Sequence, residues 1–564
     1  EVLKKHGSTV PYRINAIQFE NGESLSFRYA LGEHLDRILN QKGEELVVLT
    51  YSQSWILSTV DTLVDGGHYA RVRFSYTNGY LTGVTVPYDL SGPPGSAAYT
   101  FAYTVFRNGL SAIESVKRPM GGEERITYSE NTLAYGNNQY IPSVDTWVQI
   151  PGANQPRMTR KYSYSPGSNF SGPPYSGGFQ EGEDNLLKVA GPYVYWTEET
   201  RIDAADNNKV LMVTRTNYNK FHLQTEKTVR RDGTLSKTSV IYNMVAGQFS
   251  VQPANYAIPK TVTQRYERTG NPAREVYEHI ETDDFGNELS HTEASGVRTE
   301  YSYYPIAGEA GKCPADSHNL FPRYVKQERL FPEGATVAAR VTDYTHTRLP
   351  ATGARYFVLQ QSIVQTGSFS QQHTYYDAPA ELAGRLKTSS CTIGGLTLVS
   401  NFSYIIAGDR LIETRRLQGR EGQWVESQRT LSLVNRLEVS MTRDGGCTLA
   451  LAFDVNGRLV EEVVSPGKSQ QAKRDYAYHF STPSKAAHLI TTDAQGNQVV
   501  TSFDGLGRQV SENQLMAGPR ERAVGTRTYV ALGQLIEQVD FDYVTDGQRV
   551  LKTVYSYNSW GNSS

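Results

Sequence analysis

Apolar and polar residues alternate in short runs along most of the chain. In the run YARVRFSY at residues 69–76, Val72, Phe74 and Tyr76 share one parity. A Thr-Asn-Gly segment follows, and then a second run, Tyr80–Val86. An Asn-Gly pair between two alternating runs is a strong signal for a β-hairpin. This stretch therefore predicts a strand, a tight turn and a strand.

The same order of strand, turn and strand recurs throughout the sequence. Further examples are Phe19–Tyr29, Arg230–Tyr242, Asp283–Tyr304, Asp493–Val510 and Tyr529–Tyr543. The best helical candidate, Tyr29–Asn40, is short and is interrupted by Gly32. The 37 Tyr and 49 Gly residues, set against 6 Met, also favour a β-rich fold, because aromatic residues suit strands and glycine suits turns. We predict an all-β protein built from hairpins.

The length of 564 residues bears on how this fold is organised. A single solid core stops growing near roughly 250–300 residues, so the chain needs several domains or an architecture without one central core. Two segments rich in turn residues, 163–185 and 305–322, predict long loops, and SGPPGS at Ser91–Ser96 predicts a shorter one. None resembles a disordered linker. We predict one continuous β assembly over residues 1–564.

One hexapeptide occurs twice. It is FDVNGR at Phe453–Arg458 and FDGLGR at Phe503–Arg508. Degenerate copies occur as TDDFGNEL at Thr282–Leu289, YVALGQLIEQV at Tyr529–Val539 and YNSWGN at Tyr557–Asn562. Isolated hairpins are marginally stable, so repeated hairpins are expected to stabilise one another as neighbours in a growing sheet.

Each motif position has an expected role in the turn. Gly457 and Gly507 supply a backbone conformation that a Cβ disfavours. Asp454 and Asp504 accept hydrogen bonds from the turn backbone. Phe453 and Phe503 pack across strands. Arg458 and Arg508 are expected to pair with a carboxylate or carbonyl of a neighbouring strand.

These motifs resemble the Tyr/Phe-Asp-x-x-Gly-Arg repeat of Rhs, or YD-repeat, proteins. The motif sequences are most similar to those of the B and C components of bacterial insecticidal toxin complexes. The resemblance implies a β-sheet ribbon that spirals into a hollow, cocoon-like shell around a toxic C-terminal polypeptide. It also implies secretion or extracellular delivery from a bacterium, with a second shell component or a delivery component as further partners.

The sequence departs from that family at its C-terminal end. It has no Asp-Pro dipeptide, which in the family belongs to an aspartyl autoprotease, and it stops at Ser564 soon after a repeat. The resemblance therefore implies shell formation without enzymatic activity. About 45 strands of about 8 residues would make a sheet of roughly 6,000 Å². Closed as a sphere, this sheet would hold a compact chain of only about 70–100 residues, which is small for a toxin. We therefore expect the chain to form part of a larger shell or an unclosed one.

Composition and motifs exclude several other functions. The net charge of −2 gives no broad basic surface for nucleic acid. No apolar run reaches the ~20 residues of a membrane span, and the N-terminus has no secretory-signal pattern. Three distant cysteines predict no disulfide framework. No nucleophile elbow, zinc or phosphate-loop motif occurs, and Asp540, Asp542 and Asp546 lack calcium-loop spacing, so we expect no catalytic residue, metal or cofactor.

Three hypotheses follow for the function. The first is an encapsulation shell for a toxin polypeptide. The second is a YD-repeat adhesion or glycan-binding module, in which exposed aromatic residues bind the ligand. The third is a β-rich enzyme acting on polysaccharides, which needs a pair of carboxylates that nothing in the sequence singles out. The SGPPYSGG segment near residue 175 is a candidate partner-binding loop.

Overall fold

The structure is a computed structural model. It describes residues 13–561 except 31–33, 54, 65–66, 68, 88–96, 136–138, 167–179, 181, 334–337, 350–355, 420–421, 444–445, 516–520 and 545–546. The predicted loop at Ser91–Ser96, the SGPPYSGG segment, most of the predicted loop at 163–185, and Asp546 lie outside the described residues.

The described residues form one sheet of 38 strands, with 62% of residues in strands and 1% in helix. Two short 3₁₀ turns, η1 (Asn185–Lys188) and η2 (Phe249–Val251), interrupt the series. In chain order the strands are β1 (Ala16–Gln18), β2 (Ser24–Ala30), β3 (His34–Asn40), β4 (Glu45–Tyr51), β5 (Leu57–Leu63), β6 (Tyr69–Thr77), β7 (Tyr80–Val86), β8 (Ala97–Val105), β9 (Ser111–Lys117), β10 (Glu123–Tyr135), β11 (Gln139–Ile150), β12 (Met158–Tyr164), β13 (Val194–Asp203), β14 (Lys209–Asn219), β15 (Gln224–Arg231), β16 (Thr234–Tyr242), β17 (Pro259–Arg268), β18 (Arg274–Thr282), β19 (Glu288–Thr292), β20 (Arg298–Tyr303), β21 (Val325–Phe331), β22 (Arg340–Leu349), β23 (Phe357–Gln365), β24 (Phe369–Tyr375), β25 (Leu386–Ile393), β26 (Leu396–Ala407), β27 (Arg410–Gln418), β28 (Trp424–Ser432), β29 (Glu438–Thr442), β30 (Thr448–Phe453), β31 (Leu459–Val464), β32 (Ala472–His479), β33 (His488–Thr492), β34 (Gln498–Phe503), β35 (Gln509–Leu515), β36 (Glu521–Tyr529), β37 (Leu535–Val544) and β38 (Gly547–Val554).

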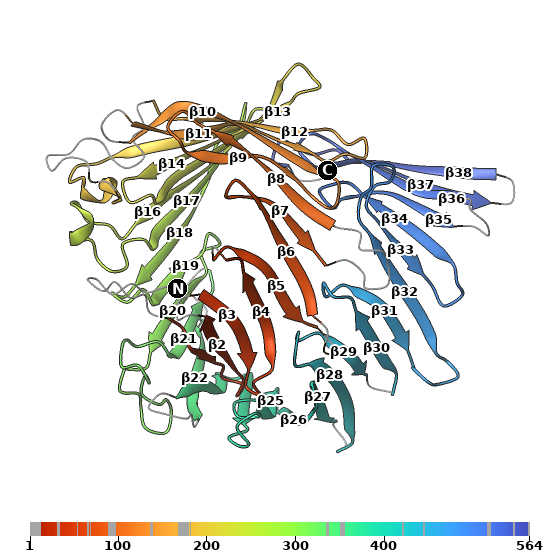
Figure 1. The fold of residues 1–564 in the computed structure, drawn as a ribbon. Coiled ribbons are helices and arrows are strands. Elements are labelled where there is room, and N and C mark those ends of the chain that lie inside the picture. The colour runs from red at the N-terminus through yellow and green to blue at the C-terminus, as the bar shows by residue number, and fades with distance from the viewer. Residues whose placement is uncertain are drawn as a thin grey trace.

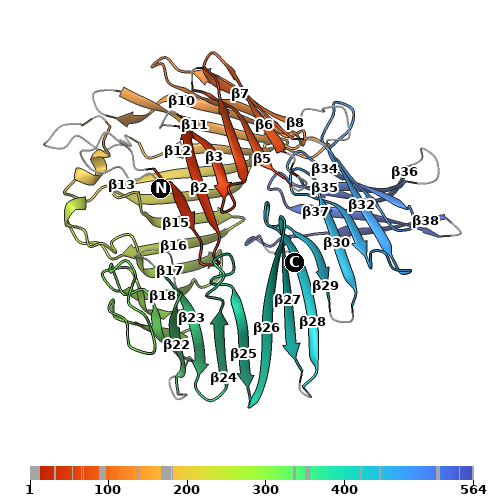
Figure 2. The same ribbon diagram turned by 60° about the horizontal axis from the view of Figure 1, so that its bottom comes forward.

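Each strand pairs with the next one in the chain, and every pair is antiparallel. The sheet is therefore a continuous meander. The sheet is not closed into a barrel, and each of its two outermost strands, β1 and β38, pairs with a single neighbour. The sheet curves so strongly that strands far apart in the chain come to lie near each other (Figures 1 and 2): the turn before β2 meets the segments before β25 and β29, and the residues after β38 meet the start of β16. The right-handed twist between adjacent strands is the general cause of such curvature.

The sheet is a single layer along most of its length. All seven residues of β7 and all seven of β35 are half-buried, whereas a strand packed on one face would alternate buried and exposed residues. The accessible surface is 32907 Å². A solid globular protein of 62.8 kDa would expose roughly 20,000 Å². An excess of about 60% agrees with a sheet whose second face no other layer of the described residues covers.

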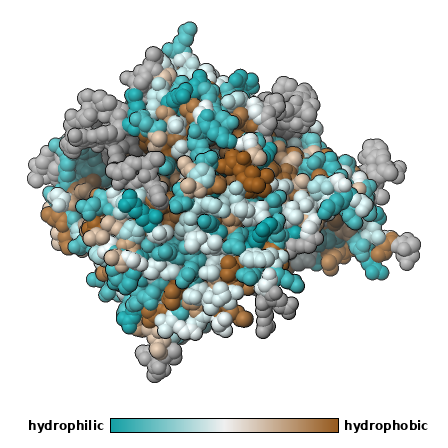
Figure 3. Space-filling model, turned by 90° about the horizontal axis from the view of Figure 1, so that it is seen from below, coloured by the Kyte–Doolittle hydropathy of each residue, from teal (hydrophilic) through white to brown (hydrophobic). Residues whose placement is uncertain are grey.

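The surface seen from below is mainly hydrophilic, and its hydrophobic side chains form separate clusters (Figure 3). Few large hydrophobic side chains are fully buried, and they lie far apart in the chain. These are Tyr304, Leu186, Leu411 and Val500. No single central core therefore stabilises the described part of the chain. Ladder hydrogen bonds and local clusters between adjacent hairpins do so instead.

The hairpin prediction for residues 69–86 is confirmed: Thr77 pairs with Tyr80, and both Asn78 and Gly79 have positive φ, at 52° and 82°. The helical candidate Tyr29–Asn40 instead spans the end of β2 and all of β3. The working figure of about 45 strands is too high for the described residues, which form 38.

The predicted loop at 305–322 contains no strand but is well packed. Cys313 in this segment is 4% exposed, and Asp316 is 5% exposed. The hydroxyl of Tyr356 donates to the carbonyl of Ala315 at 2.8 Å, which ties the segment to the start of β23. All three cysteines are free thiols.

Candidate functional site: the hairpin repeat and the seam of the wall

Both copies of the repeated hexapeptide form the same turn. In the second copy, the amide of Asp504 donates to the carbonyl of Arg508, and the amide of Gly507 donates to the carbonyl of Asp504, each at 2.9 Å. Gly507 has φ of 82°, and Gly457 in the first copy has φ of 75°. The register shifts next to each turn, at Phe453 and at Phe503. This is a three-residue hairpin loop whose last residue, the glycine, is left-handed, and a positive φ favours glycine.

The same turn is far more frequent than the hexapeptide. The same pair of hydrogen bonds closes turns that begin at Phe19, Asn40, Ser52, Phe106, Arg118, Asn219, Asp283, Glu293, Gly419, Arg443, Asp493 and Val530. At two of these turns the left-handed position carries a large side chain, Trp55 with φ of 58° and His222 with φ of 59°. The turn geometry is thus what repeats along the chain, and the hexapeptide is the sequence that marks this turn most clearly.

The aspartate of the motif binds the turn backbone as expected. The Asp504 carboxylate accepts the amides of Leu506 and Arg508 at 2.9 and 3.0 Å. The expectation that the motif arginine pairs with a group on a neighbouring strand is wrong. Nε of Arg508 donates to the carboxylate of Asp504 in its own motif at 2.7 Å, and Arg458 does the same to Asp454 at 2.7 Å. The aspartate and the arginine are four positions apart across a tight turn. The arginine therefore reaches the carboxylate of its own motif more directly than one on a neighbouring strand.

Successive repeats interlock through tyrosine. The guanidinium of Arg508 lies 4.3 Å from the ring centre of Tyr529, which opens the next degenerate copy. The hydroxyl of Tyr529 donates to the carbonyl of Gln509, the residue after Arg508, at 2.9 Å. Arg458 lies in the same way 4.5 Å from the ring centre of Tyr478. The arginine of each copy therefore makes a cation–π contact with a tyrosine of a later strand, and in the second copy that tyrosine opens the next degenerate copy and adds a hydrogen bond.

Many other tyrosines make the same kind of bond. Each donates its hydroxyl to a main-chain carbonyl that lies 15–22 positions earlier in the chain: Tyr29, Tyr51, Tyr103, Tyr128, Tyr164, Tyr242, Tyr303, Tyr375, Tyr404, Tyr543 and Tyr557. Burial raises the pKa of Tyr164 and Tyr404 to about 12. The high tyrosine content thus serves to tie hairpins together.

A seam joins segments that are far apart in the chain. At one point Glu23, in the turn before β2, binds two arginines. It accepts hydrogen bonds from Arg385, which precedes β25, and from Arg436, which precedes β29. The side chains of Glu23 and Arg385 are 13% and 10% exposed, and that of Arg436 is 47% exposed. These three residues line a cavity of about 390 Å³.

Glycines let the two sides of the seam approach at backbone distance. A Cβ on Gly505 would lie 2.1 Å from the backbone of Gly122, and a Cβ on Gly384 would lie 1.6 Å from the carbonyl oxygen of Glu20. The amide of Gly505 donates across the seam to the carbonyl of Pro151 at 2.6 Å. A side chain at these positions would hold the two sides apart.

The seam continues to the C-terminal end of the described chain. Nη2 of Arg231 donates to Oε1 of Gln534 at 3.2 Å, and the hydroxyl of Thr234 donates to the carbonyl of Ser559 at 3.1 Å. Trp560 packs edge-on against Tyr266, with ring centres 5.6 Å apart. The last residues thus rest on the ends of β15, β16 and β17.

Almost nothing in the sequence indicates the seam. Glu23 and Arg385 are 362 positions apart, and neither belongs to a motif. One weak signal exists: Gly505 occupies a variable position of the hexapeptide, where the first copy has Val455. A glycine that the turn itself does not need indicates a close backbone approach.

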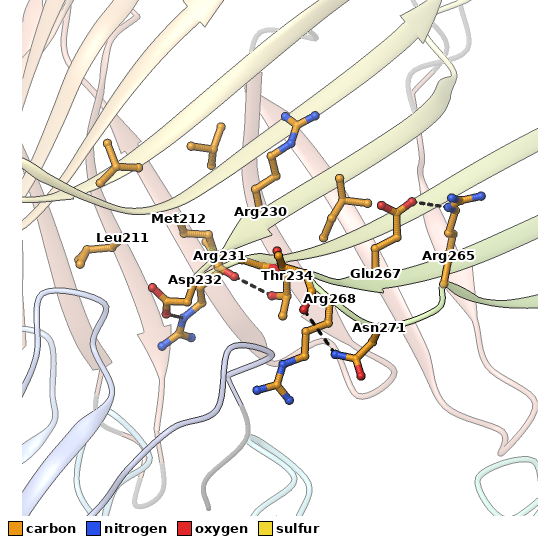
Figure 4. A pocket seen from close by; sticks show the side chains of 17 residues that line it. Leu211, Met212, Arg230, Arg231, Asp232, Thr234, Arg265, Glu267, Arg268 and Asn271 are labelled. Carbon is orange, nitrogen blue, oxygen red and sulfur yellow. Dashed lines mark hydrogen bonds and ion pairs between the residues drawn. The ribbon is translucent and has the colours of Figure 1, made fainter.

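A cavity of about 720 Å³ lies at the ends of β14 to β17 and is rich in arginine. Arg265 is neutralised by Glu267, and the side chains of Arg230 and Arg268 point in opposite directions (Figure 4). These groups do not converge on one ligand. Among the described residues no group of His, Cys, Asp and Glu could hold a metal ion, and no helix is long and apolar enough to cross a membrane.

No protein-family model and no curated protein sequence matches the chain. Solved structures do match. The chain is similar to the crystal structure of TcdB2-TccC3, with 10% identity and a TM-score of 0.30, over 95% of this chain and 32% of that one. It is also similar to TcdB2-TccC3 without its hypervariable C-terminal region (10%, 0.31, 95% and 31%) and to a Tc holotoxin pore of Photorhabdus luminescens (10%, 0.29, 96% and 30%). The chain spans about a third of the length of these structures. The similarity to Tc toxin components is coarse and concerns structure alone.

Proposed function

We propose that this chain forms part of the wall of a shell that sequesters a toxic polypeptide before delivery. The observation that carries the proposal is the single-layer sheet that curves back and joins itself along a seam. A sheet of this kind leaves one large face without any packing partner from the described chain. The motifs at Phe453–Arg458 and Phe503–Arg508, which resemble the repeats of shell-forming toxin components, support the same function.

The wall acts without catalysis in this proposal. Its partners are the enclosed polypeptide and a second shell component or delivery component, and it works outside the bacterium that makes it. The inner face has to tolerate a chain that is not folded, which a sheet of half-buried, mixed side chains can do. The ion pairs of Glu23 with Arg385 and Arg436, together with the glycine contacts of the seam, then keep the wall closed around the cargo.

The test is protease protection. An unstructured reporter of about 80 residues is fused after Ser564 and exposed to a nonspecific protease; a closed shell of roughly 6,000 Å² would hold a compact chain of about 70–100 residues. We expect the fused reporter to be degraded much more slowly than the same reporter added as a separate chain. Equal degradation rates would show that the wall protects nothing. Equal rates together with selective binding on a glycan array would favour the adhesion module instead.

A further inference from the structure

Three connections along one rim of the sheet are longer than a tight turn, and the structure describes residues 165–166, 180 and 182–193 of the first. They connect β12 to β13, β16 to β17 and β20 to β21, and the first two carry η1 and η2. Figures 1 and 2 both show η1 and the β16–β17 loop side by side beyond the strand ends. Nε2 of Gln248 donates to the carbonyl of Lys188 at 2.9 Å, which joins these two segments. The first two segments therefore form one surface and not two separate loops.

A cavity of about 290 Å³ lies between the first two segments. Its walls are mostly apolar and include Pro192, Val194, Phe221, Met244 and Val245. The volume would hold roughly ten waters at liquid density, which is ample for one large apolar side chain. Hydrogen bonds from the cavity to a polar ligand are scarce, so the cavity suits an apolar group.

Lys220 sets the shape and the charge preference of this cavity. The residue is 8% exposed, and its ammonium donates to the carbonyls of Val189, Ala190, Gly191 and Gly247. Burial lowers its pKa. An ammonium has three hydrogens, and four carbonyl oxygens already occupy them. The site therefore repels a cation and offers an anion no free hydrogen, so its ligand is neutral.

The β16–β17 loop next to the cavity is uncharged. Residues 243–258 contain no Asp, Glu, Lys or Arg in sixteen positions, although such residues make up 20% of the whole chain. The loop nevertheless exposes Val245, Phe249 and Val251 at 52%, 44% and 58%, and the adjacent Val194 is 64% exposed. Depletion of charge with exposed aromatic and aliphatic residues is typical of the core of a protein–protein interface.

We propose that this rim is a docking site for a second protein, which inserts one bulky, uncharged apolar side chain into the Lys220 cavity. The exposed residues around the cavity extend the contact beyond a single small molecule. A deep anchor surrounded by apolar contacts is the usual arrangement of an interface hot spot. The uncharged loop requires an uncharged surface on the partner, since a charge buried against it would lose its hydration without compensation. The inference does not depend on whether the wall encloses a cargo.

The test uses a displayed library of random peptides, selected on the full chain. We expect the enriched peptides to share one Leu, Met, Phe or Trp flanked by uncharged residues. Their affinity should fall at least tenfold for Val245→Asp, which puts a charge at the mouth of the cavity. Val550→Asp is the matched control, because Val550 is a similarly exposed valine, at 58%, on β38. It should bind these peptides as the unaltered chain does.

Other outcomes would overturn the inference. Failure to enrich any peptide would do so, as would charged peptides or peptides that bind Val245→Asp normally. Sedimentation of the unaltered chain forms a second arm: a dimer that Val245→Asp abolishes would show that the occupant is a second copy and not another protein. Circular dichroism of each variant checks folding. Because these variants leave the seam intact, protease protection of a fused reporter should not change, which separates failure of this inference from failure of the encapsulation proposal.

Discussion

Replacing Glu23 by Gln should open the seam without unfolding the hairpins. The change removes the carboxylate that neutralises Arg385, whose side chain is 10% exposed and whose Nε lacks a hydrogen-bond partner among the described residues. Breaking a buried ion pair by removing one partner costs about 3–5 kcal/mol. The bond to Arg436 adds at most about 1 kcal/mol, because that side chain is half-exposed. We expect a loss of about 3 kcal/mol at the seam.

The loss is best measured by native-state hydrogen exchange, which reports local opening. A loss of about 3 kcal/mol raises the opening equilibrium roughly 100-fold. The amides of Phe19 and Gly384, which are hydrogen-bonded in the turns on either side of the seam, should exchange faster by this factor. Ladder amides in the middle of the sheet should not change.

The matched control is Glu426→Gln. Glu426 binds Arg416 at 2.7 Å on the same wall, but both side chains are about half-exposed or more, at 49% and 64%. Removing this pair should cost about 0.5 kcal/mol or less. If Glu23→Gln and Glu426→Gln give the same exchange rates, the seam is not held by its buried ion cluster, and the argument from burial is wrong.

Three further predictions test the glycine contact, the repeat and the tyrosines. Gly505→Ala should cost about 1–3 kcal/mol and speed exchange of its own seam-crossing amide, because its Cβ would meet backbone at 2.1 Å. Gly191→Ala, whose Cβ meets nothing within 4 Å, should leave that amide unchanged. Asp504→Asn should destabilise the chain in urea more than Asp454→Asn, since the carboxylates are 0% and 15% exposed; equal losses would contradict the role of burial. Burial raises the pKa of Tyr404 from 10.0 to about 12, so its contribution to stability is complete below pH 10 and is lost as the pH rises through 12. The Tyr404→Phe variant should therefore lose less stability than the unaltered chain in an alkaline titration followed by circular dichroism. A profile identical to that of the unaltered chain would contradict the raised pKa of Tyr404.

The hairpins and their turns were accessible from the sequence because they depend on close neighbours. Alternating residues at 69–86 predicted β6 and β7, and the Asn-Gly pair predicted the turn between them. The positive φ of Gly457 and Gly507 and the turn bonds of the two aspartates followed from the hexapeptide alone. The turn interactions among these join residues within about five positions, where few conformations compete.

The arginine of the motif shows where local reasoning fails. Its chemistry predicted a carboxylate partner, but the choice between the carboxylate of its own motif and one on a neighbouring strand depends on how the side chain lies over the turn. The ring of Tyr529, from the next hairpin, lies over the Arg508 guanidinium, and this contact depends on how the two hairpins pack. The turns that begin at Ser52 and Asn219 were not among the predicted hairpins, because Trp55 and His222 occupy the left-handed position that glycine usually marks.

The sequence by itself thus determined the class of fold, the strands and the chemistry of each turn. The tertiary structure decided that the wall meets itself, and where it does so. Glu23 finds Arg436 across 413 positions only after many strands have added their individual twists. A small change in the twist per strand would bring other residues together, and no single segment of the sequence encodes that sum. The same holds for the Lys220 cavity, whose walls come from loops that become neighbours only when their strands are paired.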